Sequence, residues 1–174
     1  PLIVVDPRPE ADATRGTVDD ALVEAIDLLP TFVEAAGGTV PTHILEGRSL
    51  MPRLRGEGGE WRDYSISQCD YAFRGARRTL GRAASNSLAW MVCGQRWKYI
   101  HYDGFAPQLF DLENDPKEQN DLGTSPDHAV ERAQMKEALF DWLTHRRMRV
   151  TLPDAAVEAR TDTHKERGYL FGVW

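Results

Sequence analysis

The feature that most constrains the fold is a stretch of short apolar runs at residues 89–123. The first two runs, residues 89–93 and 97–102, are rich in aromatic and aliphatic side chains and are separated by a connection that begins with Gly94. This spacing predicts a β-hairpin, because glycine readily adopts the backbone conformation that a tight connection requires. A third run, at residues 108–112, follows a second turn and predicts an antiparallel meander.

Helical periodicity is strongest after the meander, over residues 129–147. Pro126 stands where a first helical position is expected, and basic residues at the other end would complement the helix dipole. The expected apolar stripe comprises Val130, Ala133, Met135, Leu139, Trp142 and Leu143. We therefore expect one helix packed across the antiparallel sheet.

The start of the chain has a different pattern. Residues 2–5 are a continuous apolar run, which is typical of a strand buried on both faces of a parallel sheet. Such a strand needs neighbouring strands, and the chain offers few parallel candidates. Because the chain also begins with Pro1 rather than methionine, we expect it to be a piece of a larger protein.

Shorter elements are predicted from local patterns. Apolar side chains recur at helical spacing over residues 18–29, after Thr17 as the expected cap. A second helix is expected at residues 31–36 and would stop at Gly37, because glycine favours the left-handed conformation that ends many helices. The remaining expectations are a polar loop at residues 10–16, a short helix at 51–55, a β-like run at 64–69 and a loop at 74–87.

The composition limits the partners of the chain. A net charge of -6 argues against non-specific nucleic-acid binding, which requires a basic surface. No apolar run approaches the roughly 20 residues of a membrane helix, and no signal-peptide pattern is found, so neither a nucleic-acid nor a membrane partner is expected. Cys69 and Cys93 are too few for a disulfide framework. We predict a cytoplasmic location and reduced thiols.

An acidic turn follows the third strand, with oxygen-bearing side chains at alternate positions from Asp111 to Asp115. A calcium loop of this kind needs glycine at its sixth position and a bidentate glutamate at its twelfth. Pro116 and Leu122 occupy those positions. A structural turn is therefore the favoured interpretation.

Other chemical motifs are weak. There is no G-x-S-x-G elbow, phosphate-binding loop or C-x-x-C pair, and the histidines never fall at close metal-ligand spacing. These histidines are His43, His101, His128, His145 and His164. The arginines of residues 74–82 could meet an anionic partner or form a solvated surface. Several aromatic residues could form a platform on which a ligand stacks, or could simply pair with one another across neighbouring strands. They are Trp90, Trp97, Tyr99, Tyr102 and Phe105.

One longer pattern combines the meander with the acidic turn. It consists of Lys-Tyr-Ile at residues 98–100, Leu-Phe-Asp-Leu-Glu-Asn-Asp-Pro-Lys-Glu at 109–118 and Asn-Asp-Leu at 120–122. This pattern resembles the C-terminal signature of sulfatases, which belong to the alkaline-phosphatase superfamily. Similarity to the phosphonate monoester hydrolase branch lies at residues 1–4, Thr31, residues 47–50 and residues 160–165. The resemblance covers nearly the whole of this chain. It corresponds, however, to only the C-terminal part of such an enzyme.

The resemblance implies a mixed α/β fold, of the α+β kind within this chain. Residues 1–60 would be the C-terminal end of the large α/β domain. Residues 61–147 would form a smaller subdomain with an antiparallel sheet and a packed helix, and residues 148–174 a C-terminal extension. The extension ends in an apolar segment, residues 169–174, which we expect to dock on another subdomain or chain, so that a homo-oligomer is predicted.

The resemblance also indicates which chemistry this chain lacks. In such enzymes a cysteine in a C-x-[PSA]-x-R segment becomes a formylglycine nucleophile, and a divalent metal (manganese, calcium or magnesium) is held by acidic residues and an Asp-His-Gly segment. None of these segments occurs here, and Cys69 is followed by Asp70 and Tyr71. We therefore predict no catalytic residue, no metal ligand and no bound cofactor in this chain, and assign no substrate-binding residue.

Two functional hypotheses remain open. In the first, the chain is the C-terminal part of a metal-dependent hydrolase of sulfate esters, phosphonate monoesters or phosphodiesters, is inactive alone, and has the N-terminal catalytic part as its partner. The parent enzyme would then bind a small anionic ester. In the second, the chain is a stand-alone binding or assembly module derived from the sulfatase fold.

Overall fold

The computed structural model describes residues 2–146, 151–161, 163 and 168. The chain divides into two compact units, and each is described by itself. The first unit comprises Pro1–Glu24 and Pro52–His145. The second comprises Ala25–Met51 and Arg146–Trp174.

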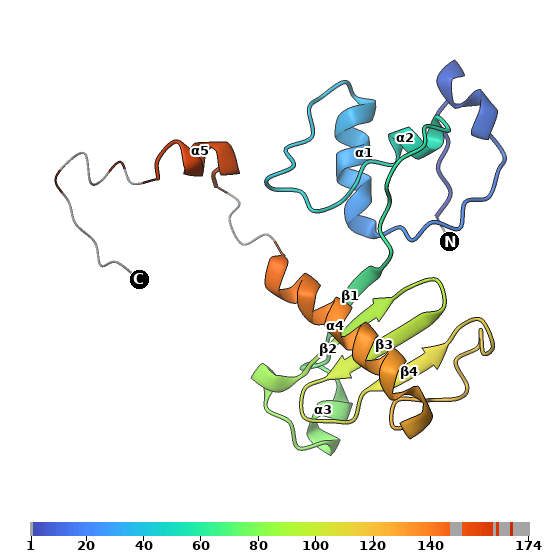
Figure 1. Ribbon diagram of the computed structural model, residues 1–174, viewed down its shortest axis with the longest axis vertical. Coiled ribbons are helices and arrows are strands. Elements are labelled where there is room, and N and C mark those ends of the chain that lie inside the picture. Colours follow the sequence, from blue (N-terminus) through green and yellow to red (C-terminus); the bar gives the residue numbers. More distant parts are fainter. Residues whose placement is uncertain (1, 147–150, 162, 164–167, 169–174) are drawn as a thin grey trace. The chain divides into compact units, whose positions relative to one another are not determined.

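An antiparallel sheet of four strands forms the centre of the first unit (Figure 1). The strands follow one another in sequence order: β1 (Ser65–Asp70), β2 (Leu88–Cys93), β3 (Trp97–Tyr102) and β4 (Gln108–Asp111). Each strand pairs antiparallel with the next. The predicted meander, and the β-like run that precedes it, are confirmed.

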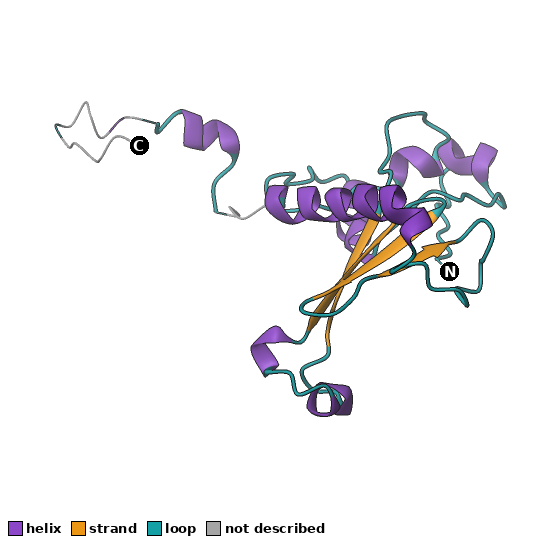
Figure 2. Ribbon diagram, turned by 60° about the horizontal axis from the view of Figure 1, so that its bottom comes forward, coloured by secondary structure: helices purple, strands orange, loops and turns teal. Residues whose placement is uncertain are grey.

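Helix α4 (Ala129–His145) lies across one face of this sheet (Figure 2). A single 3-10 turn, η4 (Pro126–His128), leads into it and places Pro126 at its start, as predicted. Val130 and Ala133 depart from the predicted apolar stripe, because both are exposed, Val130 to 65%. The predicted helix is confirmed as far as His145, and Arg147 lies outside the described residues.

The hydrophobic core of the first unit lies between α4 and the sheet. It is built from Val92, Tyr99, Leu109, Met135 and Leu139. Successive side chains of a strand point to opposite faces, so the neighbours of these strand residues lie on the face away from α4. The predicted mixed α/β class, with an antiparallel sheet and a packed helix, is confirmed.

The predicted strand at residues 2–5 is absent. No regular secondary structure is assigned there, and Ile3 and Val5 are 87% and 70% exposed. A strand forms only where another strand supplies hydrogen-bond partners, and the sheet of the described chain contains residues 65–111 alone. An apolar sequence without a partner strand is thus left exposed.

The predicted helix at residues 18–29 is wrong for residues 18–24, although residues 25–27 form a 3-10 turn and residues 28–29 lie in an α-helix. Residues 17–24 have no helical assignment, because their polar groups serve contacts with residues far along the chain. The Asp19 carboxylate accepts two hydrogen bonds from Arg53, each 2.7 Å long, and the Leu22 carbonyl accepts one from Trp61 Nε1 at 2.8 Å. The Glu24 carboxylate accepts the Ile66 backbone N–H at 2.5 Å. Tertiary contacts therefore override the helical periodicity.

The second unit contains the 3-10 turn η2 (Ala25–Asp27) and helix α1 (Leu28–Ala35). The helix begins three residues before the predicted start, with Pro30 in its first turn, where its missing N–H is tolerated. Gly37 has φ +78° directly after the helix, which confirms the predicted stop.

The remaining elements are short. They are η1 (Pro9–Thr14), α2 (Met51–Leu54), α3 (Gly75–Thr79), η3 (Ala84–Asn86) and α5 (Asp154–Glu158). Helix α2 confirms the prediction at residues 51–55, whereas η1, α3 and η3 lie in segments predicted as loops. The apolar end at residues 169–174 lies outside the described residues. Among the described helices, none is long and apolar enough to cross a membrane.

Candidate functional site

The face of the sheet opposite α4 carries a cavity of about 680 Å³. Its floor consists of alternate residues of all four strands: Ser67, Cys69, Ala89, Met91, Ile100, Tyr102 and Gln108. Its rim comes from Ala76 and Leu80 near α3 and from the segments before β4 and after the acidic turn. We call this surface the open face.

The open face is chemically suited to packing rather than to proton transfer. Most of its lining is aliphatic or aromatic, and the Tyr102 hydroxyl already donates to Gln108 Oε1 at 2.7 Å. Burial raises the pKa of Tyr102, which keeps this phenol protonated. One polar atom is left over: the buried Tyr71 hydroxyl has no hydrogen-bond partner among the described residues. A buried donor of this kind favours a partner that supplies an acceptor.

The acidic turn is structural, as predicted. Asp111 is 6% exposed, and its carboxylate accepts from Arg96 Nη2 at 2.8 Å, from Asn114 Nδ2 at 2.9 Å and from the Glu113 N–H at 3.2 Å. The hydrogen bond with Arg96 and the bonds from Asn114 hold the pKa of Asp111 well below its usual range. These interactions occupy the carboxylate that a calcium loop would use as a ligand.

The arginine-rich segment is partly structural. Arg77 Nε donates to the Ala72 carbonyl at 2.7 Å, and Arg82 Nη2 donates to the Asp103 carboxylate at 2.9 Å. Arg74 and Arg78 are exposed. Two of the four arginines therefore fix the local chain, and an anionic partner for the other two stays a prediction.

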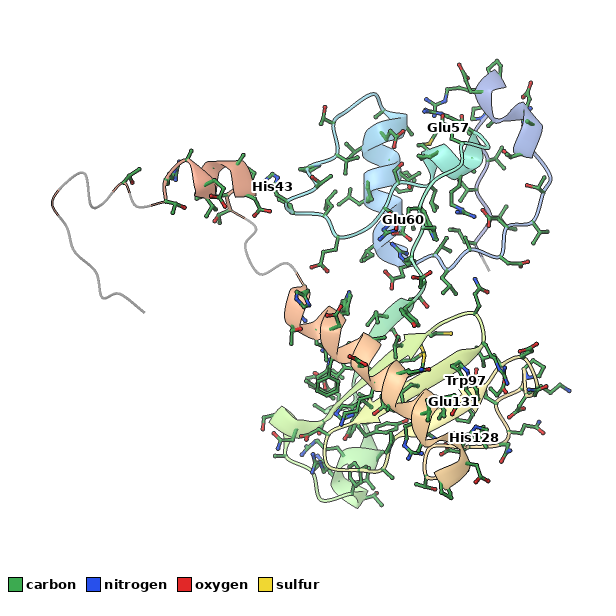
Figure 3. The ribbon with its side chains drawn as sticks, viewed as in Figure 1. His43, Glu57, Glu60, Trp97, His128 and Glu131 are labelled. Carbon is green, nitrogen blue, oxygen red and sulfur yellow. The ribbon has the colours of Figure 1, made fainter. Side chains whose placement is uncertain are left out.

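The aromatic residues of the meander do not form one platform. Tyr99 is buried against α4, whereas Tyr102 lies on the open face. Trp97 packs against His128, with ring centroids 5.7 Å apart, and His128 Nδ1 lies 3.9 Å from Glu131 Oε2 (Figure 3). Rings on opposite faces and at the helix start cannot stack on a single ligand.

The described residues do not provide a metal centre or a modified cysteine of the sulfatase kind. No group of three or more histidine, cysteine, aspartate or glutamate side chains is placed to hold a metal ion in that part of the chain. Cys69 is exposed on β1 and Cys93 is half-buried, where burial raises its pKa and so opposes formation of the thiolate. The absence of catalytic residues from this chain stays a prediction.

Two of the segments that resemble phosphonate monoester hydrolases, Thr31 and residues 47–50, stabilise the second unit. Thr31 Oγ1 donates to the Asp27 carbonyl at 2.6 Å and accepts the Leu50 N–H at 2.9 Å. Gly47 approaches η2 so closely that a Cβ there would lie 2.1 Å from the Ile26 carbonyl oxygen. The short run at residues 47–50 therefore docks on the start of α1 through backbone groups.

Sequence reasoning missed the open face as a site. Its members come from four strands and two loops, and only the register of the sheet brings them together. The small side chains at alternate positions, Ser67 and Cys69 of β1 and Ala89 of β2, were the available signal. It does not show which face a helix will cover.

Comparisons with known proteins place this chain in a family. A family model described as N-sulphoglucosamine sulphohydrolase, C-terminal, matches residues 1–145. The chain belongs to this family of sulfatase C-terminal regions, within the alkaline-phosphatase superfamily, and the resemblance inferred from sequence is confirmed.

Individual relatives agree with this assignment. The chain is 33% identical over 146 residues to arylsulfatase K of Xenopus laevis, covering 82% of this chain and 26% of that protein. It is 27% identical over 150 residues to the multifunctional alkaline phosphatase superfamily protein PehA of Trinickia caryophylli, covering 83% and 29%. It therefore spans between a quarter and a third of the length of these relatives.

A solved structure shows the same architecture. The phosphonate monoester hydrolase of Agrobacterium radiobacter matches with a TM-score of 0.67 and 29% identity, covering 74% of this chain and 26% of that one. The antiparallel sheet and its helix thus belong to the shared fold.

Proposed function

We propose that this chain is the C-terminal part of a metal-dependent hydrolase of sulfate esters or phosphonate monoesters, and that it supports the active-site pocket by packing against the catalytic part of the same protein. The match of residues 1–145 to a family of sulfatase C-terminal regions is the observation that carries the proposal. The relatives are named as sulfatases and a phosphonate monoester hydrolase, and this chain covers only a fraction of each.

The surface of the first unit supports a packing role. Ile3 and Val5 are largely exposed in an apolar run, and the open face presents a mainly apolar cavity with the unpaired Tyr71 hydroxyl. Apolar patches of this kind mark interaction surfaces in soluble proteins. We propose that the catalytic part covers the open face, and that it also supplies the strand that residues 2–5 require.

The nucleophile, the metal and the residues that bind them belong to that catalytic part in this proposal. The described residues of this chain hold no candidate for them, so the chain by itself should be inactive. Cytoplasmic location remains a separate proposal, carried over from the sequence.

Two activity assays test the proposal. The longer protein, with its upstream sequence, should hydrolyse 4-nitrophenyl sulfate or a 4-nitrophenyl phosphonate monoester. A chelator should abolish this activity. The 174-residue chain should hydrolyse neither substrate. Turnover by the purified 174-residue chain would overturn the division of roles. An upstream sequence without a C-x-[PSA]-x-R segment and without activity would favour the stand-alone module.

A matched pair of substitutions tests the open face in the longer protein. Ser67→Glu adds a charge to the floor of the cavity, and Ser85→Glu adds the same charge at an exposed position in η3. Because burying a charge without a partner is costly, we expect only Ser67→Glu to lower the activity and the thermal stability of the longer protein. Equal behaviour of the two variants would contradict docking at the open face.

The oligomer prediction has its own test. We propose that residues 148–174 contribute to subunit contacts of the longer protein. Their deletion should lower the number of subunits in its assembly, measured as molecular mass by light scattering. An unchanged assembly would rule out this role.

A further inference from the structure

A second cavity, of about 380 Å³, lies between α4 and the connection from β3 to β4. It adjoins the open face, because Phe105 and Pro107 line both cavities, but Tyr99 and His101 point toward the α4 side of the sheet. Its lining consists of Tyr99, His101, Phe105, Pro107, Ala129, Arg132, Ala133 and Lys136. The volume lies in the lower part of the range of about 300–1,000 Å³ that is usual for small-molecule sites. We call it the α4 pocket.

Two cations lie on the helical wall of this pocket. Arg132 and Lys136 are one turn apart on α4, on the same flank as Ala129 and Ala133. Neither forms an ion pair within the part of the chain that the structure describes. Arg132 Nη1 donates to the Ser125 carbonyl at 2.8 Å, which anchors the guanidinium while its other N–H groups stay available. Lys136 Nζ lies 5.4 Å from the centre of the Phe140 ring.

The opposite wall adds a polar pair to these cations. The Tyr99 hydroxyl lies 3.4 Å from His101 Nδ1. Burial and the charge of Lys136 lower the pKa of His101, and Asp103 opposes them more weakly. Only the effect of Lys136 on this pKa reflects a positive charge at the pocket, since burial disfavours an ion of either sign. This is a local property, since the chain as a whole has a net charge of -6.

The remainder of the lining is apolar. Phe105, Pro107, Ala129 and Ala133 offer carbon surface beside the two cations. A bare inorganic anion would leave this surface in contact with water, whereas a neutral ring would leave the cations unused. A ligand that joins a ring to an anionic group would use both parts of the pocket.

We propose that the α4 pocket is a binding site for a small tetrahedral oxyanion carried on a ring, such as an organic sulfate, sulfonate or phosphonate. The anionic group lies between Arg132 and Lys136, where the forked guanidinium can bind two of its oxygens. The ring lies on Phe105 and Pro107. This site shares Phe105 and Pro107 with the open face, whereas Arg132 and Lys136, which would bind the anion, do not line that face.

An NMR titration of the 174-residue chain with benzenesulfonate tests the site, because this probe cannot be hydrolysed. Backbone amide signals of Arg132, Ala133 and Lys136 should shift together and saturate. Methanesulfonate lacks the ring and benzyl alcohol lacks the charge, so each should bind at least fivefold more weakly. Equal affinity for all three compounds, or no saturable shift at these amides, would overturn the proposal.

Charge-removing variants assign the anion contact. Lys136→Gln should weaken benzenesulfonate binding at least threefold, and the double variant with Arg132→Gln at least tenfold. Lys117→Gln, at an exposed position just after the acidic turn, is the matched control and should bind like the unmodified chain.

Lys136→Gln removes no hydrogen bond that holds the helix, so it decides the matter even if the double variant does not fold. Unchanged binding in Lys136→Gln, or an equal loss in Lys117→Gln, would contradict the site. A glutamate-rich peptide that displaces benzenesulfonate at lower concentration would show that the surface binds acidic protein segments, and would also overturn the proposal.

Discussion

The two faces of the central sheet are made by the same four strands, yet they differ in what covers them. Toward α4, Val92, Tyr99 and Leu109 are at most 1% exposed and pack against the helix. On the open face, Ser67 and Cys69 of β1 are exposed, and an apolar cavity lies between the strands and the surrounding loops. One face is covered within this chain, and we propose that a partner covers the other. The following predictions test that difference.

The largest effect is expected where α4 meets the sheet. Leu139 is fully buried in the core, so Leu139→Ala should lower the free energy of unfolding by about 2–5 kcal/mol, through lost burial and the cavity left behind. Denaturant titration followed by circular dichroism measures it. Val130→Ala, at a position of the same helix that is 65% exposed, is the control and should change stability by no more than about 0.5 kcal/mol. Equal losses would show that α4 is not held by this core.

A smaller effect is expected at the end of β4. Asp111→Asn removes the charge that pairs with Arg96 and should cost about 1–3 kcal/mol, whereas Glu113→Gln, at an exposed partner of the same arginine, should cost no more than about 0.5 kcal/mol. Chemical unfolding at neutral pH compares the two.

The Asp111 carboxylate also makes the free energy of unfolding depend on pH in the acid range. Because the folded-state pKa of Asp111 lies below its unfolded value, its contribution is complete above about pH 4 and is lost as the pH falls toward the folded-state pKa. Asp111→Asn should therefore flatten the decrease in unfolding free energy below pH 4. An unchanged acid profile would contradict the stabilising role of the pair.

His101 gives a weaker pH dependence on the α4 side of the sheet. Its pKa is lowered by burial and by Lys136, although Asp103 acts in the opposite direction, and its ring also lies against Trp90, Tyr99 and Phe140. The unfolded state then binds a proton more readily, so stability should rise as the pH increases from the folded-state pKa toward about 6.5. His101→Phe should reduce this rise, measured by unfolding at pH 5 and pH 7.5. A rise of the same size in the variant would exclude His101 as its source.

The smallest effect is expected on the open face. In the 174-residue chain, Ser67→Glu should change the unfolding free energy by no more than about 0.5 kcal/mol, because Ser67 is exposed. The same substitution should be damaging in the longer protein if a partner covers this face. A large loss in the 174-residue chain would mean that the open face is already closed within it.

Prediction from local sequence pattern was correct where a segment's own residues determine its structure. The meander, the acidic turn, the helix after Pro126 and the stop at Gly37 were all predicted, because glycine, proline and apolar spacing act over a few residues. The longer pattern at residues 98–122 was also sufficient to identify the family.

Prediction from local sequence pattern failed where residues far along the chain determine the structure of a segment. Residues 18–29 have helical periodicity, but Asp19, Leu22 and Glu24 instead use their polar groups on Arg53, Trp61 and Ile66. Residues 2–5 have strand composition and no strand to pair with. In both cases the structure depends on hydrogen-bond partners that the segment does not contain.

The sequence by itself therefore determined the family, the antiparallel sheet with its helix, and the turns that connect them. Only the tertiary structure decided which face of the sheet α4 covers, that the opposite face holds an apolar cavity, and that Arg132 and Lys136 line a pocket with Phe105 and Pro107. The physical reason is that turns and periodicity are set by neighbours in the chain. A cavity is set by the register and packing of segments that the chain order keeps apart.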